Sequence, residues 1–339
     1  MYSNPESKTC HFVMNYNKIH PFYITNDDVL FFDIWIKNNQ LYMILPCPVT
    51  NPIDINSIEV FEFDQILHIK SKFIYDYFEN TSLIIYHPFE NLKNYYNIKV
   101  KYKKFEKQYV IYDYMSIKNF TLTLSTLCKD DYKYFYPFYH YYKSQGVEYF
   151  FIYYNDNITR DVLIFFKKFD DVLLIEWNYT YWFNKKYGSH YAQPAQINHA
   201  LYKYGKGFTE YMIFCDLDEY LQNKKSTLIN LIRQQSRLNA IYFRNIWSKT
   251  IHPLNPLTLM HKRNILVGKP FNTMYRCKQI IRVDKIISTG IHHLREHLRE
   301  PLYIKNASFD PDNLCYHFFQ LTQPDRIVED NVTNVIYLR

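Results

Sequence analysis

The sequence predicts an all-β domain followed by an α/β domain with a mainly parallel, Rossmann-like sheet. Up to about residue 117, short runs of alternating apolar and polar residues are separated by polar turns, a pattern typical of a β-sandwich. From Phe120 onward, strand-like runs alternate with helical patterns, which indicates parallel strands joined by helices. We therefore expect one domain at residues 1–117 and a second at residues 118–339.

In the N-terminal half, two pairs of strand-like runs face each other across polar turns. The first pair is Val29–Ile36 and Gln40–Leu45, and the second pair is Tyr96–Tyr102 and Gln108–Tyr114. Further short strands are expected at residues 57–63, 66–75 and 83–86. No catalytic constellation is visible in this half of the chain.

The C-terminal half alternates strands with helices. Strands are expected at residues 120–127, 147–154, 172–177, 212–215 and 240–243. Helices are expected at residues 131–145, 158–169, 192–204 and 226–237. Asp130 or Asp131 can cap the first of them, and Gly146 and Gly205 provide stop signals for two of them. Beyond Ser248 the pattern is irregular, and we expect edge strands at Ile280–Val283 and Leu302–Ile304.

Composition limits the classes of protein to which the chain of 339 residues can belong. Hydrophobic residues make up 47% of it, which is enough for a sizeable core. Only 6 glycines occur and no Gly-x-Gly-x-x-Gly or P-loop motif is present, so those nucleotide-binding classes lose their main support. The formal charge of +7 suits anionic ligands, but no dense basic run indicates a nucleic-acid partner.

The chain shows no signal for secretion or membrane insertion. Its first residues are polar, and no run of about 18 apolar residues predicts a membrane span. The six cysteines are scattered without a Cys-x-x-Cys pair, so we expect them to be reduced. We therefore expect a cytoplasmic protein, and the excess of Tyr, Phe, Asn, Ile and Lys is typical of an AT-rich genome, viral genomes included.

The apolar run Met212–Cys215 leads directly into three carboxylates, Asp216, Asp218 and Glu219. Ligands of open parallel sheets bind beyond the carboxyl ends of the strands. Asp216 and Asp218 can share a face of an extended segment, and two close carboxylates with oxygen ligands suit Mg²⁺ or Mn²⁺. The alternative is a solvated acidic turn, but the buried run and the third carboxylate favour a metal site.

Eight short motifs follow one another between residues 120 and 320: Leu127–Asp131, Tyr139–Val147, Phe151–Asp156, Gln196–Ala200, Asp216–Glu219, Tyr275–Ile281, Ile291–His293 and Leu314–His317. In this order and spacing they resemble glycosyltransferase family 92, and more broadly the GT-A fold. Two departures stand out. Phe138 replaces the family's usual Trp, and Tyr154-Asn155-Asp156 replaces its usual Tyr-Asp-Asn.

The resemblance implies a metal-dependent transferase that moves a sugar from a nucleotide-diphosphate donor, which we expect to be a UDP-sugar, to a glycan, glycoprotein or other hydroxyl acceptor. Asp218 would be the first ligand of Mn²⁺ or Mg²⁺, with Asp216 beside it or reaching the ribose. His317 would be the third ligand, although a structural, buried His317 is an equal alternative. The N-terminal half lies outside this resemblance, and because it shows no catalytic constellation we expect it to serve in packing or in acceptor recognition.

The resemblance also suggests donor contacts by six further residues: Asn155, Asp156, Gln196, Asn198, Lys278 and His293. Each has a plain structural alternative, such as an Asn/Asp turn, an exposed helix face or a solvated lysine. An inverting transfer needs a base to deprotonate the acceptor hydroxyl. Glu219 is the carboxylate nearest to the proposed metal; its alternative roles are to cap the following segment or to hold an Arg or Lys in place, and Asp310 and Asp312 are alternative bases.

Two other functional classes stay open at this point. The first is a catalytically silent carbohydrate-binding protein on the same fold, against which the intact set of Asp216, Asp218 and His317 argues. The second is another metal-dependent nucleotide enzyme, such as a nucleotidyltransferase. Such an enzyme usually has a Gly-rich or basic phosphate loop near the first strand, and none is present here.

Overall fold

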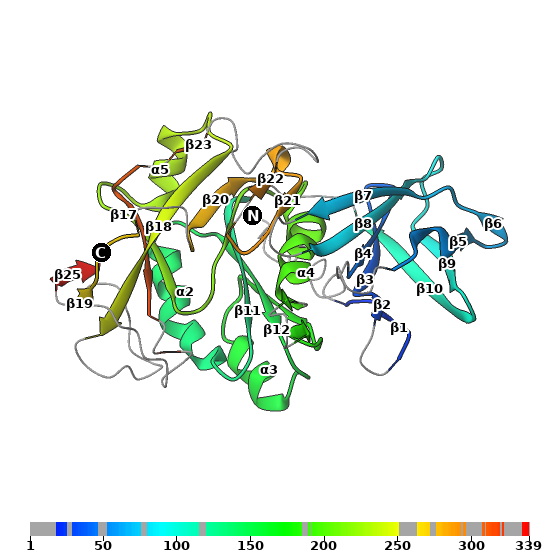
Figure 1. Cartoon of the computed structure of the whole chain (residues 1–339), viewed down its shortest axis with the longest axis horizontal. Helices are drawn as coiled ribbons and strands as arrows, with labels where there is room; N and C mark the ends of the chain where they lie inside the picture. The colour runs from blue at the N-terminus through cyan, green and yellow to red at the C-terminus, as the bar shows by residue number, and fades with distance from the viewer. Residues whose placement is uncertain are drawn as a thin grey trace, which may run out of the picture.

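The computed structural model of the chain describes residues 18–25, 29–46, 53–75, 80–114, 120–184, 189–190, 192–250, 263–271, 276–292, 294–295, 307–308, 310–318, 321 and 334–338. These residues form a β-rich N-terminal part and a larger α/β part that lie side by side (Figure 1). The predicted edge strand Leu302–Ile304 lies outside the described residues.

The N-terminal part is built around one eight-stranded sheet with the order β6-β5-β9-β10-β3-β4-β8-β7. Its strands are β3 (Asp33–Lys37), β4 (Gln40–Leu45), β5 (Ile58–Glu62), β6 (Gln65–Ile66), β7 (Lys70–Tyr75), β8 (Asn80–Pro88), β9 (Tyr95–Tyr102) and β10 (Phe105–Tyr114). All neighbours pair antiparallel except β10 and β3, which make a short parallel contact. The strands β1 (Phe22–Tyr23) and β2 (Val29–Phe31) pair separately.

Both predicted hairpins are present. Asn38 and Asn39 connect β3 to β4 with φ values of 49° and 59°, a left-handed conformation that Asn tolerates better than most residues. In the second hairpin, Lys103 and Lys104 form the turn, so β10 begins earlier than its alternating pattern predicts. Apolar residues of β3 and β4 share one core with those of β5, β9 and β10. The sandwich-like domain at residues 1–117 stays a prediction.

The α/β part contains a mixed sheet with the order β13-β12-β11-β16-β20-β18-β19-β25. The first four strands are parallel: β11 (Phe120–Cys128), β12 (Tyr149–Tyr154), β13 (Val172–Glu176) and β16 (Thr209–Phe214). The others join antiparallel: β18 (Ala240–Thr250), β19 (Arg263–Val267), β20 (Lys278–Arg282) and β25 (Asn334–Leu338). Three more strands attach beside them: β17 (Glu219–Asn223), β23 (Ala307–Ser308) and β24 (Asn313–His317).

The prediction of a mainly parallel sheet is therefore correct only for its first four strands. The prediction of an edge strand at Ile280–Val283 is wrong, because β20 lies between β16 and β18. A strand in that position is covered on both faces, and Lys278 and Gln279 are buried as fully as the isoleucines that follow them. Short hairpins β14–β15 (Trp182–Asn184, Ser189–His190) and β21–β22 (Ser288–Thr289, Leu294–Arg295) complete the described strands.

Within the described residues, four α-helices connect the strands, close to the predicted positions: α2 (Phe135–Ser144), α3 (Arg160–Phe166), α4 (Ala192–His199) and α5 (Leu228–Gln234). Gly146 ends α2 with a φ of 95°, and a Cβ atom at this position would lie 2.5 Å from the Ile229 side chain, so only glycine fits. The α4 helix continues as a π-helix over Ala200–Gly205, which ends at the predicted glycine.

Helix α4 joins the two parts of the molecule. It lies between the N-terminal sheet, where it contacts β4 and β8, and β11 of the α/β sheet (Figure 1). Asp33 of β3 is fully buried against it, with Oδ2 2.8 Å from His199 Nε2 and 2.7 Å from Lys203 Nζ. Lys37 Nζ donates to the Lys203 carbonyl at 2.8 Å, close to the end of the π-helix. The N-terminal part therefore packs as an integral support of α4.

No helix in the described part of the chain is long and apolar enough to span a membrane. Cys128, Cys215, Cys277 and Cys315 are buried free thiols, as predicted. Cys10 and Cys47 lie outside the described residues.

Candidate active site

The acidic motif lies where β16 ends and the chain turns back as β17. β17 begins at Glu219 and pairs antiparallel with β24, which places Glu219 opposite His317. On its other side β24 pairs with β18, which places Trp247 opposite His317. Two strand pairings therefore bring His317 to the carboxylates.

Asp218 and His317 form the first contact of the site. Asp218 Oδ2 is 3.4 Å from His317 Nε2, and the Asp218 carbonyl accepts a hydrogen bond of 2.7 Å from the Phe318 amide. The His317 ring packs against Trp247 with 4.8 Å between ring centres. Burial lowers the pKa of His317, but the charges of Asp218 and Glu219 raise it, and the net pKa is above the ordinary value.

Asp216 is held by a second set of contacts. Its Oδ1 accepts a hydrogen bond of 2.9 Å from Gln193 Nε2 at the start of α4, and its Oδ2 is 3.3 Å from Lys278 Nζ. Lys278 also lies 2.8 Å from Glu219 Oε2, which accepts a hydrogen bond from the Asp216 amide. The side chain of Asp216 is 36% exposed, so Asp216 is the carboxylate of this group that faces solvent.

Lys278 and Glu219 are both almost completely buried. Burial lowers the pKa of Lys278, but Asp216 and Glu219 outweigh it and raise the pKa well above the ordinary value. Burial raises the pKa of Glu219, and Lys278 acts in the opposite direction. The geometry thus shows Glu219 holding a lysine in place, which is the alternative to its predicted role as the base.

Asp131 is a site residue that sequence reasoning treated only as a helix cap. Its side chain makes no capping hydrogen bond to the 3-10 turn that follows and instead accepts one of 2.9 Å from the Lys129 amide. Burial, together with the charges of Asp218 and Asp216, raises the pKa of Asp131 to about 6, although the hydrogen bond from the Lys129 amide acts in the opposite direction. Its position just after β11 was the available signal, because β11 and β16 are parallel neighbours.

Two buried tyrosines of α2 fix the strand that carries Glu219. Tyr142 donates from its hydroxyl to the Glu219 carbonyl at 2.9 Å and accepts from the Leu221 amide at 3.0 Å. Tyr141 donates to the Leu221 carbonyl at 2.7 Å. Part of the motif Tyr139–Val147 therefore acts as a support behind the acidic cluster.

The donor atoms present fit a divalent cation through Asp218 and His317. A carboxylate oxygen and an imidazole nitrogen converge there, and both are ordinary ligands of Mn²⁺. Among the described residues, no group of three or more His, Cys, Asp or Glu side chains is placed to hold a metal ion. The chain thus offers two ligands at this point, and Asp216 is turned toward Gln193 and Lys278.

Comparison with known families decides where the chain belongs. The model of glycosyltransferase family 92 matches residues 118–313, which include Asp216, Asp218, Glu219 and Lys278. The chain belongs to glycosyltransferase family 92. His317 lies beyond the matched residues, so its place in the site depends on the geometry described above.

No curated protein matches the family 92 chain. Weakly similar solved structures include S. aureus TarS 1-349, with 12% identity, a TM-score of 0.35, and coverage of 59% of this chain and 61% of that one. TarS 1-349 in complex with UDP has 12% identity, a TM-score of 0.30, and coverage of 48% and 47%. HddC from Yersinia pseudotuberculosis has 13% identity, a TM-score of 0.33, and coverage of 59% and 93%. At these low scores the likenesses add nothing to the family assignment.

In this family 92 protein, Lys278 lies at the acidic cluster, whereas Asn155 and Asp156, which are also expected to bind the donor, are held by other contacts. The Asn155 amide donates to the carbonyls of Trp177 and Tyr179, at 2.8 Å each, and Asp156 pairs with Lys129 at 2.8 Å. Their roles as donor contacts stay predictions.

Two further predicted donor contacts lie on α4 and brace it. Gln196 donates to Ser125 Oγ at 2.8 Å, and Asn198 exchanges hydrogen bonds with the backbone of Thr289. His293 lies outside the described residues, and its neighbour His292 has Nδ1 3.1 Å from the Cys277 carbonyl. Their roles in donor binding also stay predictions.

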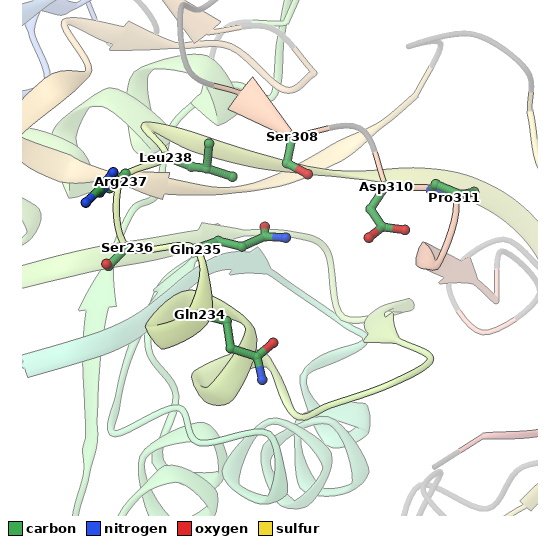
Figure 2. A pocket seen from close by; sticks show the side chains of 8 residues that line it. All are labelled: Gln234, Gln235, Ser236, Arg237, Leu238, Ser308, Asp310 and Pro311. Atoms are coloured by element: carbon green, nitrogen blue, oxygen red, sulfur yellow. The ribbon is translucent and has the colours of Figure 1, made fainter.

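A cavity of about 770 Å³ shares no lining residue with this cluster. It is lined by Gln234, Gln235, Ser236, Arg237, Leu238, Ser308, Asp310 and Pro311 (Figure 2). The Ser236 carbonyl accepts hydrogen bonds from Tyr211 and Arg282, which are paired near the amino end of β16. Asp312 is paired with Lys225 at 2.6 Å. The alternative bases Asp310 and Asp312 precede Asn313, at the opposite end of β24 from His317.

Proposed function

We propose that the protein is a metal-dependent glycosyltransferase that moves a sugar from a nucleotide-diphosphate donor, a UDP-sugar, to a hydroxyl of a glycan or glycoprotein. The observation that carries this proposal is the convergence of Asp218 and His317 just after β16, next to the half-exposed Asp216, in a family 92 chain. The proposal includes an N-terminal domain at residues 1–117 and a GT-A domain at residues 118–339.

Asp218 and His317 would hold Mn²⁺ or Mg²⁺, and such an ion supplies positive charge against the departing nucleoside diphosphate. Gln193 and Lys278 hold Asp216 at its exposed position, where its carboxylate is available to the ribose or to a bound water. Tyr142 fixes the backbone of Glu219 and so keeps the neighbouring Asp218 in place. Each of these contacts is formed before the donor arrives, so little reorganisation is needed.

The base that takes the proton from the acceptor hydroxyl is proposed to be a carboxylate of the same cluster. Glu219 is the residue indicated by the sequence, and its Oε1 lies 3.8 Å from His317 Nδ1. Asp131 is the second candidate, because its carboxyl is close enough to Asp216 and Asp218 for their charges to raise its pKa. Measuring transfer and donor binding in Glu219→Gln and in Asp131→Asn separates the two candidates. Replacing the residue that acts as the base should remove transfer and leave donor binding intact, and replacing the other residue should not.

The test of the proposed function is release of nucleoside diphosphate from a panel of nucleotide sugars in the presence of Mn²⁺, with Asp218→Asn as the matched control. We expect release by the wild type from at least one donor and none by the variant. Glycan binding without any release would instead support a catalytically silent carbohydrate-binding protein.

A further inference from the structure

The sequence predicts that Lys278 contacts the donor, but in the structure Lys278 pairs with two carboxylates instead. Its Nζ atom lies between Glu219 and Asp216, at 2.8 and 3.3 Å, and its side chain is only 3% exposed. Moving Lys278 toward a phosphate would leave the buried Glu219 carboxylate without its partner, which is energetically costly. A second cation near the cluster would therefore be better placed to meet the diphosphate.

Arg276 lies two residues before Lys278, just ahead of β20, and is half-buried. Its guanidinium carbon is 5.2 Å from the centre of the Trp247 ring, a cation–π contact. The same Trp247 ring is 4.8 Å from the ring of His317, which contacts Asp218. Arg276 is thus joined to the candidate metal ligands through a single aromatic side chain.

The backbone of Arg276 adds a second, independent observation. Its φ angle is 54°, in the left-handed region that non-glycine residues rarely adopt. The other non-glycine residues with positive φ in the described chain are Asn38, Asn39, Phe63 and Lys103, and all four lie in tight turns between paired strands. Strained backbone of this kind in non-glycine residues is concentrated at active sites and ligand-binding positions.

The chemistry of arginine suits this position. A guanidinium offers parallel N–H donors that match two phosphate oxygens, and it keeps its charge while stacked on an indole ring. We propose that Arg276 contacts the diphosphate of the donor, a role that rests on the proposed function. In this role, Trp247 positions the Arg276 guanidinium near Asp218 and His317.

The experiment measures the dissociation constants of nucleoside diphosphates (UDP, GDP, ADP and CDP) and of the matching monophosphates by titration calorimetry with Mn²⁺. For the nucleoside that wild type prefers, Arg276→Ala should weaken diphosphate binding by about 10- to 100-fold, because a charge-assisted hydrogen bond is lost. Monophosphate binding should change much less, and Arg276→Lys should recover part of the loss. The matched control is Arg282→Ala at the other end of β20, where Arg282 pairs with Asp284, and it should change neither constant.

The outcomes separate the possible errors. If Arg276 only covers Trp247, the alanine variant will melt at a lower temperature and bind both ligands with an unchanged ratio of constants, which overturns the inference and leaves the proposed function standing. If wild type binds no nucleoside diphosphate, the proposed function is wrong and the inference falls with it.

Discussion

Glu219 and Lys278 form a buried ion pair, with 2.8 Å between Oε2 and Nζ, at the point where β16 gives way to β17. The pair is satisfied on both sides, because Glu219 also accepts from the Asp216 amide and Lys278 also reaches Asp216. It ties β17 to β20 and so sets the distance between the acidic motif and the rest of the sheet.

Breaking this pair should destabilise the protein strongly. Lys278→Met should lower the free energy of unfolding by about 3–5 kcal/mol, because it leaves a carboxylate buried without its partner. The double variant Lys278→Met with Glu219→Gln should recover much of that loss, since no net charge then remains buried. Denaturant unfolding of the three proteins provides the measurement, and equal stability of the single and double variants would contradict the assignment.

The buried triad of Asp33, His199 and Lys203 predicts a pH dependence of stability. Burial lowers the pKa of His199 to about 4, although Asp33 acts in the opposite direction. The unfolded chain therefore binds a proton on His199 between about pH 6.5 and pH 4, and the folded chain does not. This residue's contribution to stability is lost as pH falls through that window.

His199 should change the free energy of unfolding by at most about 1.4 kcal/mol per pH unit, which is the slope for the binding of one proton. His199→Gln should remove it, because a neutral amide can still bond to Asp33 and to the Tyr153 hydroxyl, which lies 2.7 Å from His199 Nδ1, and an amide does not titrate. Urea unfolding between pH 4 and pH 7 measures the slope. An unchanged slope in the variant would show that another group controls it.

Gly146 predicts a local steric test. Gly146→Ala should lower the free energy of unfolding by about 1–3 kcal/mol, because the new Cβ atom meets Ile229 and the φ of 95° is unfavourable for alanine. Adding Ile229→Ala removes the contact with Cγ2 but leaves the 2.5 Å contact with the Cβ atom of residue 229, and it leaves the backbone strain. That double variant should therefore recover little of the lost stability in denaturant unfolding, and a full recovery would contradict this account.

The sequence predicts those parts of the site that depend on local patterns. Met212–Cys215 is recognisable as a buried strand, and Asp216, Asp218 and Glu219 follow it without interruption. The hairpin at Asn38 and Asn39 and the stop at Gly146 are equally local. These features depend on a few neighbouring residues, so one sequence is enough to place them.

The remaining features depend on long-range pairing. The position of His317 follows from the register of β24 against β17 and β18, which no local spacing specifies. Lys278 reads as a surface lysine until its two carboxylate partners are known. Asp131 reads as a helix cap until β11 is placed beside β16.

The central claim is that Asp218 and His317 bind one divalent ion that meets the donor's phosphates. Titration calorimetry of UDP with and without Mn²⁺, on wild type, Asp218→Asn and His317→Ala, tests it most directly. We expect wild-type binding to depend on Mn²⁺, Asp218→Asn to lose that dependence while keeping its fold, and His317→Ala to lose it in part. Binding that is equally tight without Mn²⁺, or unchanged in Asp218→Asn, would contradict the claim and leave the acidic motif as an ordinary turn.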